Sequence, residues 1–195
     1  MRTERTLQQA ALDLFAKQGY DETTTEEIAD KAGVSPRTFF RYFATKESVL
    51  FVGQYDWFQT FTSVFLNQPR AVSEFEAISQ TLVGLAEGLA PRRKALLLYE
   101  RAVASSAALR GGVHDNLQDE ISVVADAIAT RRELKQPDES CYLLAHISLV
   151  TNRRALTKWL EGPANLDAGA VIAAEFELLR SLLAPAKSNG RRRPS

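Results

Sequence analysis

The sequence predicts an all-α protein. Almost every segment of the 195-residue chain repeats its apolar residues at the helical period, and no run alternates long enough to predict a strand. Glycine, proline and capping residues recur between these segments, where helices begin and end. With 45% hydrophobic residues, the chain can bury the core of one domain, or of two small domains that share an interface.

The first two helices are marked by their stop and start residues. An apolar stripe runs from Leu7 to Phe15, and Gly19 ends it. Thr24 lies three residues before Glu27, the spacing at which a hydroxyl and a carboxylate cap a helix start reciprocally. Gly33 is expected to end this second helix.

The stretch VSPRTFFRYF predicts a third short helix, Pro36 to Phe43, with two different faces. Ser35 can cap it, and Pro36 suits its first position, where no N–H is needed. Phe39 and Phe43 are four residues apart and therefore share one face, which we expect to be buried. The opposite side carries Arg37, Phe40, Arg41 and Tyr42.

The remaining helices are predicted from the same punctuation. We expect them over about 45–67, 73–88, 91–105, 115–130, 137–161 and 167–183. The Gly111-Gly112 pair is expected to break the chain before the fourth of these. The predicted domains are 1–46, a unit of three helices; 47–184, a larger helical domain; and 185–195, a disordered basic tail.

Composition argues against several functional classes. The single Cys141 cannot form an internal disulfide, and the first residues lack the apolar run of a secretory signal, which favours a cytoplasmic protein. No apolar stretch approaches the roughly 20 residues of a membrane span. His114 and His146 lie in no catalytic or metal-ligand pattern, so we expect no enzyme, no metal and no cofactor.

A helix, a glycine turn and a second short helix form the unit that places one helix in a DNA groove. The third helix is about 12 Å long at 1.5 Å per residue, close to the width of the major groove. Net charge is zero, but every charged residue from Ser35 to Lys46 is basic. This local excess suits a surface that faces phosphates.

A longer pattern resembles the DNA-binding domain of the TetR family of bacterial transcriptional regulators. It consists of Gly19-Tyr20, Thr23-Thr24, Ile28-Ala29, Ala32-Gly33-Val34-Ser35, Thr38, Phe40, Tyr42-Phe43, Lys46-Glu47 and Leu50. The resemblance implies a homodimeric repressor on a palindromic double-stranded operator, with 1–46 as its helix-turn-helix DNA-binding domain and 47–184 as its effector-binding and dimerisation domain. It also implies a helical carboxy-terminal domain that binds a small effector and then releases DNA.

By the same resemblance, Thr24, Thr38, Tyr42 and Lys46 contact phosphates, while Arg37 and Arg41 read base edges. Phe40 replaces the tyrosine most frequent in the family and keeps only apolar contact. Thr24 and Ser35 would cap helices in any protein, so capping alone remains the alternative role for both.

The resemblance also places an apolar effector cavity beside the fourth helix and those after it. The expected lining is Phe58, Phe61, Phe65, Leu85, Leu89, Leu98 and Tyr99, with ordinary core packing as the alternative. An apolar or amphiphilic effector follows, and residues 78–183 resemble family members that respond to acyl-coenzyme A compounds.

The last two predicted helices carry long apolar faces that can form a four-helix dimer seam. The expected seam residues are Ile147, Val150, Leu156, Trp159, Val171, Ile172, Phe176 and Leu179. The alternative is that these residues complete the core of the monomer. A helical adaptor without any small effector is the competing function.

Overall fold

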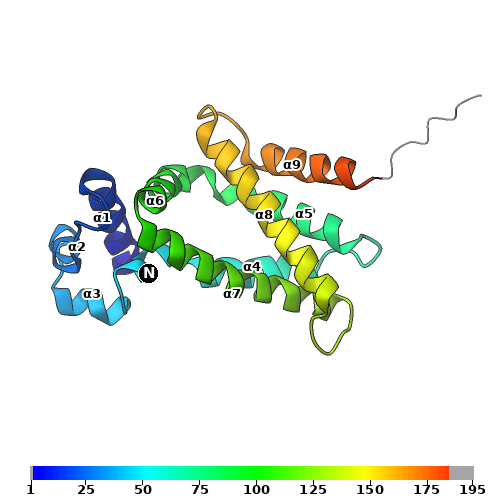
Figure 1. Ribbon diagram of the computed structural model, residues 1–195, viewed down its shortest axis with the longest axis horizontal. Helices are drawn as coiled ribbons and strands as arrows, with labels where there is room; N and C mark the ends of the chain where they lie inside the picture. The colour runs from blue at the N-terminus through cyan, green and yellow to red at the C-terminus, as the bar shows by residue number, and fades with distance from the viewer. Residues whose placement is uncertain (1, 185–195) are drawn as a thin grey trace, which may run out of the picture.

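The computed structural model describes residues 2–184, apart from the side chains at positions 2, 54, 55, 108 and 111–116. The tail predicted at 185–195 lies outside the described residues. Within the described part the chain is helical, without strands (Figure 1). The elements are α1 (Arg2–Gln18), α2 (Thr25–Lys31), α3 (Pro36–Tyr42), η1 (Glu47–Phe51), α4 (Gln54–Leu66), α5 (Glu74–Leu85), η2 (Ala86–Gly88), η3 (Ala90–Arg92), α6 (Arg93–Ser105), α7 (Ala107–Arg131), α8 (Glu139–Glu161) and α9 (Ala168–Leu183).

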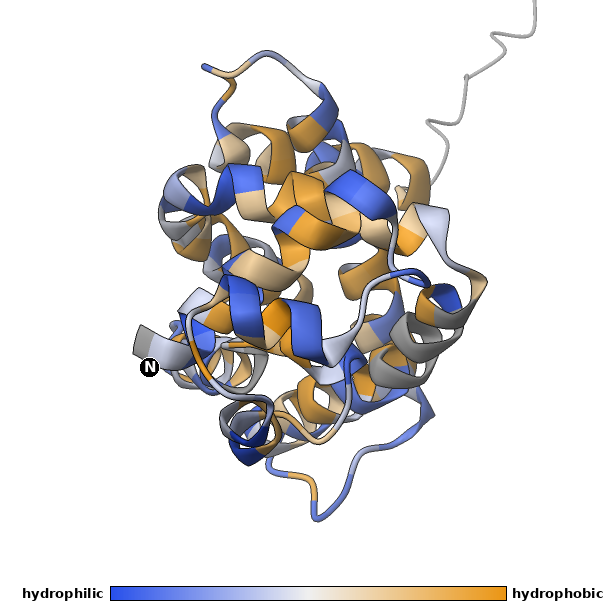
Figure 2. Cartoon of the chain, turned by 90° about the vertical axis from the view of Figure 1, so that its left-hand side faces the viewer, coloured by the Kyte–Doolittle hydropathy of each residue, from blue (hydrophilic) through white to orange (hydrophobic). Residues whose placement is uncertain are grey.

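Helices α1, α2 and α3 form one end of the molecule, and the helices from α4 to α9 form the rest (Figure 1). Most helices carry both hydrophobic and hydrophilic residues along their length, as amphipathic helices do (Figure 2). The apolar sides gather into two buried cores. The larger core surrounds Phe65, Trp159 and Phe176, where α4, α5, α7, α8 and α9 meet.

The smaller core belongs to the α1–α3 end but is shared with the rest of the chain. Leu7, Ile28 and Phe39 are fully buried in it. Val49 and Leu50 of η1 belong to it as well, and so do Ala102, Val103 and Leu109 of α6 and α7. The first unit therefore depends on the second part of the chain for a complete core.

The fourth helix differs from its prediction, because residues 45–67 do not form one helix. Residues Glu47–Phe51 form the 3₁₀ helix η1, and α4 begins only at Gln54. Between them, Gly53 has a φ of 80°, a left-handed conformation that costs other residues energy and ends a regular helix. The side chains of η1 and α4 therefore do not follow one continuous helical period.

The predicted break at Gly111-Gly112 is also wrong, because α7 continues through both glycines. Ser106 caps this helix and accepts a hydrogen bond from the Leu109 N–H at 3.4 Å. Leu109 and Ile121 are buried on either side of the pair. This packing outweighs the roughly 1 kcal/mol that each glycine costs a helix.

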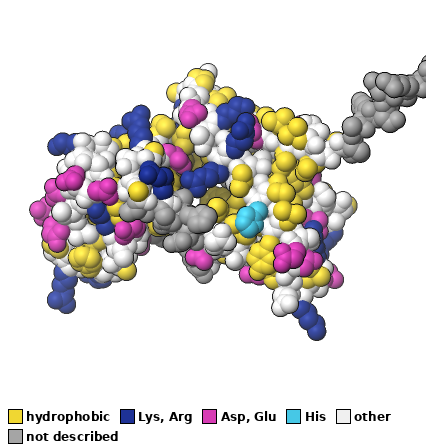
Figure 3. All heavy atoms as spheres, in the orientation of Figure 1, with side chains coloured by type: hydrophobic (Ala, Val, Ile, Leu, Met, Phe, Trp, Pro, Cys, Tyr) yellow, Lys and Arg dark blue, Asp and Glu magenta, His cyan; other side chains and the backbone are white. Residues whose placement is uncertain are grey.

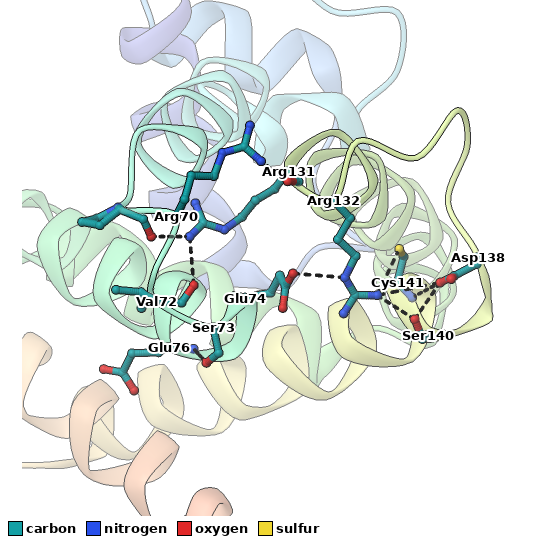
Figure 4. Close-up of polar contacts among 11 residues, drawn as sticks. Arg70, Val72, Ser73, Glu74, Glu76, Arg131, Arg132, Asp138, Ser140 and Cys141 are labelled. Carbon is teal, nitrogen blue, oxygen red and sulfur yellow. Dashed lines mark hydrogen bonds and ion pairs between the residues drawn. The ribbon is translucent and has the colours of Figure 1, made fainter.

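Two consecutive arginines join the end of α7 to its neighbours (Figure 4). The buried Arg131 donates to the carbonyl oxygens of Gln68 at 2.9 Å, Pro69 at 2.6 Å and Val72 at 3.0 Å, in the loop after α4. Arg132 points the other way, to Glu74 at 3.2 Å and to the first turn of α8. Arg131 thus holds the loop between α4 and α5 against the end of α7.

Replacing Arg131 by Met should lower the free energy of unfolding by about 2–4 kcal/mol, because the buried guanidinium and several part-buried loop carbonyls lose their hydrogen bonds. Denaturant unfolding at one fixed protein concentration measures this. Arg101→Met, at an exposed arginine, is the matched control and should change stability by less than about 0.5 kcal/mol. Equal stability of the two variants would contradict the role given to Arg131.

Candidate nucleic-acid interface and effector cavity

The start of α2 has the reciprocal cap that the sequence predicts. The Glu27 N–H donates to the Thr24 hydroxyl at 3.2 Å, and the Thr24 N–H donates to the Glu27 carboxylate at 2.9 Å. The hydrogen bond from the Thr24 backbone, followed by that from Gln18, lowers the pKa of Glu27. Thr24 is exposed and therefore also accessible to a phosphate.

The turn between α2 and α3 sets the direction of α3. Gly33 has a φ of 70°, which glycine adopts without steric cost. Ser35 then caps α3 by accepting from the Thr38 N–H at 3.2 Å, and Pro36 occupies the first turn. The caps of α2 and α3, at Thr24 and Ser35, therefore both follow from the local sequence alone.

Two phenylalanine rings hold α3 in place. Phe39 is completely buried and Phe43 nearly so, with ring centroids 5.4 Å apart. The same helix leaves Phe40 53% and Tyr42 37% exposed, with Arg37 and Arg41 exposed beside them. The predicted division of this helix into a buried and an outward face is confirmed.

The outward face of α3 carries a shallow hollow with basic and aromatic side chains. Its lining consists of Ser35, Arg37, Thr38, Phe40 and Arg41. The Arg41 guanidinium lies 5.1 Å from the centre of the Tyr42 ring, so a cation–π contact orients it. Lys and Arg side chains project outward from the edge of the molecule where α3 lies (Figure 3).

Lys46 has a structural role that its sequence context does not indicate. Its ammonium donates to the carbonyl oxygens of Tyr20 at 2.8 Å and Thr23 at 2.9 Å, and lies 4.0 Å from the centre of the Tyr20 ring. These contacts tie the start of η1 to the loop before α2. The half-buried ammonium therefore has protein partners already, which an exposed phosphate-binding lysine would lack.

A cavity of about 300 Å³ lies where the two parts of the chain meet. Of the lining that the resemblance implies, Phe58, Leu85, Leu89 and Tyr99 do border this cavity. Leu12 of α1 and Leu50 and Phe51 of η1 line the side toward the DNA-binding unit. The other apolar walls come from Trp57, Leu82, Leu96, Leu117, Leu149, Leu156, Leu160 and Ile172.

Three residues expected in the cavity lie elsewhere. Phe61 and Phe65 are buried in the larger core, stacked with ring centroids 5.8 Å apart. Leu98 packs against the smaller core. The helical period identifies an apolar face but not which neighbour fills it, and the register change at Gly53 rotates α4 relative to the expected helix.

The polar groups of the cavity are few. Arg92, Glu100, Glu120 and Arg153 lie among its lining residues, and Asn152 lies within its apolar wall. Basic side chains gather beside the hollow between the two halves of the molecule (Figure 3). Burial raises the pKa of Tyr99 to about 12, so its phenol remains protonated at neutral pH. Sequence patterns gave no signal for Asn152, because its setting depends on the packing of α8.

The residues expected at a dimer seam divide into two groups. Trp159, Val171, Ile172 and Phe176 are buried in the subunit's own core, and Leu156 lines the cavity. For these five, the alternative of core packing describes their position. Ile147 and Leu179 are half-buried, and Val150 is 58% exposed.

An exposed apolar face does run along α8 and α9 (Figure 3). Its residues are Leu143, Val150, Leu178, Leu182 and Leu183. Leu143 and Val150 are two helical turns apart, and Leu178 and Leu182 one turn apart, so each pair shares one side of its helix. Such a patch marks a protein interface more often than free surface.

Two family profiles match the chain. Residues 7–51 match "Bacterial regulatory proteins, tetR family", and residues 71–184 match the "MftR C-terminal domain", which covers more than half of the chain. The chain belongs to the TetR family. It is thus a transcriptional regulator with a DNA-binding domain and not an enzyme, as the sequence predicts.

Curated relatives match this TetR-family chain mainly through its first part. HTH-type transcriptional regulator TcmR of Streptomyces glaucescens is 56% identical over 48 residues, 25% of this chain and 21% of that protein. Putative mycofactocin biosynthesis transcriptional regulator MftR of Mycobacterium tuberculosis is 36% identical over 47 residues, 24% of each chain. These alignments span about a quarter of either relative's length.

Solved structures resemble the whole TetR-family chain. FadR of Thermus thermophilus, a TetR-family repressor in complex with lauroyl-CoA, has a TM-score of 0.62 at 22% identity and covers 98% of this chain and 99% of its own. The SmeT–triclosan complex has a TM-score of 0.65 at 16% identity and covers 100% of both chains. These likenesses show the shared fold. None of the helices in residues 2–184 combines the length and apolar character of a membrane span.

Replacing Lys46 by Met should lower the free energy of unfolding by about 1–2 kcal/mol, because two carbonyls lose a charged donor. Lys17→Met, at an exposed lysine, is the control and should be nearly neutral. If the ammonium serves the fold alone, the slope of log K for DNA against log[salt] stays unchanged. A slope smaller by about 0.9 would show instead that Lys46 also neutralises a phosphate.

Proposed function

We propose that this protein is a repressor that binds a palindromic operator through α3. The supporting observation is the two-sided α3, whose Phe39 and Phe43 are buried while Arg37 and Arg41 stand exposed beside Phe40 and Tyr42. A fixed helix with exposed guanidinium groups can enter the major groove and bond guanine edges. Thr24, Ser35, Thr38 and Tyr42 lie near enough in sequence to this helix to contact the adjoining phosphates.

The proposed regulator acts as a homodimer. Its seam consists of the exposed apolar face on α8 and α9, extended by the half-buried Ile147 and Leu179. Two subunits can then place their α3 helices on half-sites about 34 Å apart, or a multiple of this distance. A twofold protein reads twice the number of bases, which raises both affinity and specificity.

The effector in this proposal is a small apolar or amphiphilic molecule that occupies the cavity. The cavity is mostly apolar and borders α1 and η1, so its occupant contacts elements that hold α3. FadR and SmeT, which share the fold, were solved with lauroyl-CoA and triclosan. Operator affinity measured with and without a bound ligand tests this part, since an effector must bind the two protein arrangements unequally.

Replacing Arg37 by Ala should weaken binding to the operator by about tenfold to a hundredfold per half-site, because one bidentate base contact is lost. The operator is first selected from random duplexes with the unaltered protein, and affinity is measured at one salt concentration. Lys135→Ala, in the exposed α7–α8 loop, should bind normally. A failure to select any palindrome would contradict operator recognition and favour a helical adaptor.

Replacing Val150 by Asp should shift the protein from dimer to monomer, because it places a charge in the middle of the proposed apolar seam. Sedimentation equilibrium across a dilution series measures the mass. Leu134→Asp, at an exposed leucine in the α7–α8 loop, is the matched control and should remain dimeric. A Val150→Asp protein of unchanged mass would show that the seam lies elsewhere.

A further inference from the structure

This inference deepens the effector part of the proposed function and rests on it. Asn152 lies in the middle of α8. This side chain lines the cavity and is only 8% exposed, yet its Oδ1 has no hydrogen-bond partner among the described residues. Buried carboxamide oxygens are almost always bonded, so one without a partner calls for an explanation.

The surroundings of Asn152 make the unpartnered oxygen costly. Leu149 and Leu156, the cavity-lining residues on the preceding and following turns of α8, are apolar. Asparagine also has a lower helix propensity than leucine, so it is unfavourable in the middle of a helix. A position that departs from both packing and helix preference, and that faces a cavity, is typical of a binding site.

The charges around the cavity limit what a ligand can carry beside Asn152. Arg92 and Arg153 are the lining cations, and both are exposed, so their charges lie toward solvent. Glu100 and Glu120 balance them in sign. Among the described residues that line the cavity, no cationic side chain is buried. None can therefore pair with an anionic ligand group at the depth of Asn152. A buried anion would therefore lose its hydration without compensation.

We propose that Asn152 determines ligand specificity, and that the effector is a neutral amphiphile with a hydrogen-bond donor placed against this residue. A carboxamide or a hydroxyl meets the requirement, because each donates to Oδ1 and can also accept from the amide nitrogen. The apolar walls enclose the rest of the molecule. An ether or ester at the same place leaves Oδ1 without a partner and binds more weakly.

The experiment compares 1-decanol, decanamide, decyl methyl ether and sodium decanoate as competitors of the dye N-phenyl-1-naphthylamine bound to the full-length protein. We expect the alcohol and the amide to bind about tenfold more tightly than the ether, the worth of one net hydrogen bond. In Asn152→Leu, of similar volume, this preference should disappear. Leu156→Ala is the matched control, which weakens the alcohol and the ether by the same factor and keeps their ratio.

The outcomes separate this inference from the effector proposal beneath it. Equal affinities for alcohol and ether in the unaltered protein, with operator release by both, would leave the effector cavity valid and overturn the role of Asn152. Decanoate binding as tightly as decanol would overturn the neutral character of the ligand. If neither the dye nor any competitor binds, both the effector cavity and this inference fail. The ratio of the alcohol and ether affinities in the unaltered protein tests the role of Asn152 even if the Asn152→Leu variant does not fold.

Discussion

The position of α3 depends on the apolar contact between α1 and the α6–α7 junction. Ala102, Val103 and Leu109 complete the core that also buries Phe39. At the same junction the Ser106 hydroxyl donates to the Asp21 carboxylate at 3.0 Å. Asp21 lies in the loop whose carbonyl oxygens accept hydrogen bonds from Lys46. The DNA-binding unit therefore cannot turn freely, since any rotation would expose apolar surface at about 25 cal/mol per Å². Its direction is set by the helices that carry the cavity.

The cavity borders the elements that hold the DNA-binding unit in place. Leu12 of α1 and Leu50 of η1 line it, and both also belong to the smaller core. Gln8 joins these two elements through a hydrogen bond of 3.4 Å to the Leu50 carbonyl. Beyond η1, Gly53 in its left-handed conformation separates η1 from α4, so these two elements do not form one rigid rod.

Helix α8 serves both the cavity and the outer surface. Leu149, Asn152 and Leu156 face the cavity, while Leu143 and Val150 are exposed on another side of the same helix. A ligand against Asn152 thus contacts the helix that we propose to form the dimer seam. The buried Glu175 of α9 binds Arg154 at 2.7 Å and Lys158 at 2.9 Å, which fixes α8 against α9. The cavity and the exposed apolar face therefore share one helix pair that these ion pairs hold together.

Local features of this protein were determined by the sequence itself. The caps at Thr24 and Ser35 form as predicted, because a side chain and an amide three residues away need no distant partner. The two faces of α3 follow from helical period for the same reason. Only the tertiary structure decided what each apolar face meets. Helix α7 continues through its two glycines, Trp159 and Phe61 are buried in the core, and Asn152 lines the cavity. Each of these positions depends on packing between distant segments, which outweighs local preference.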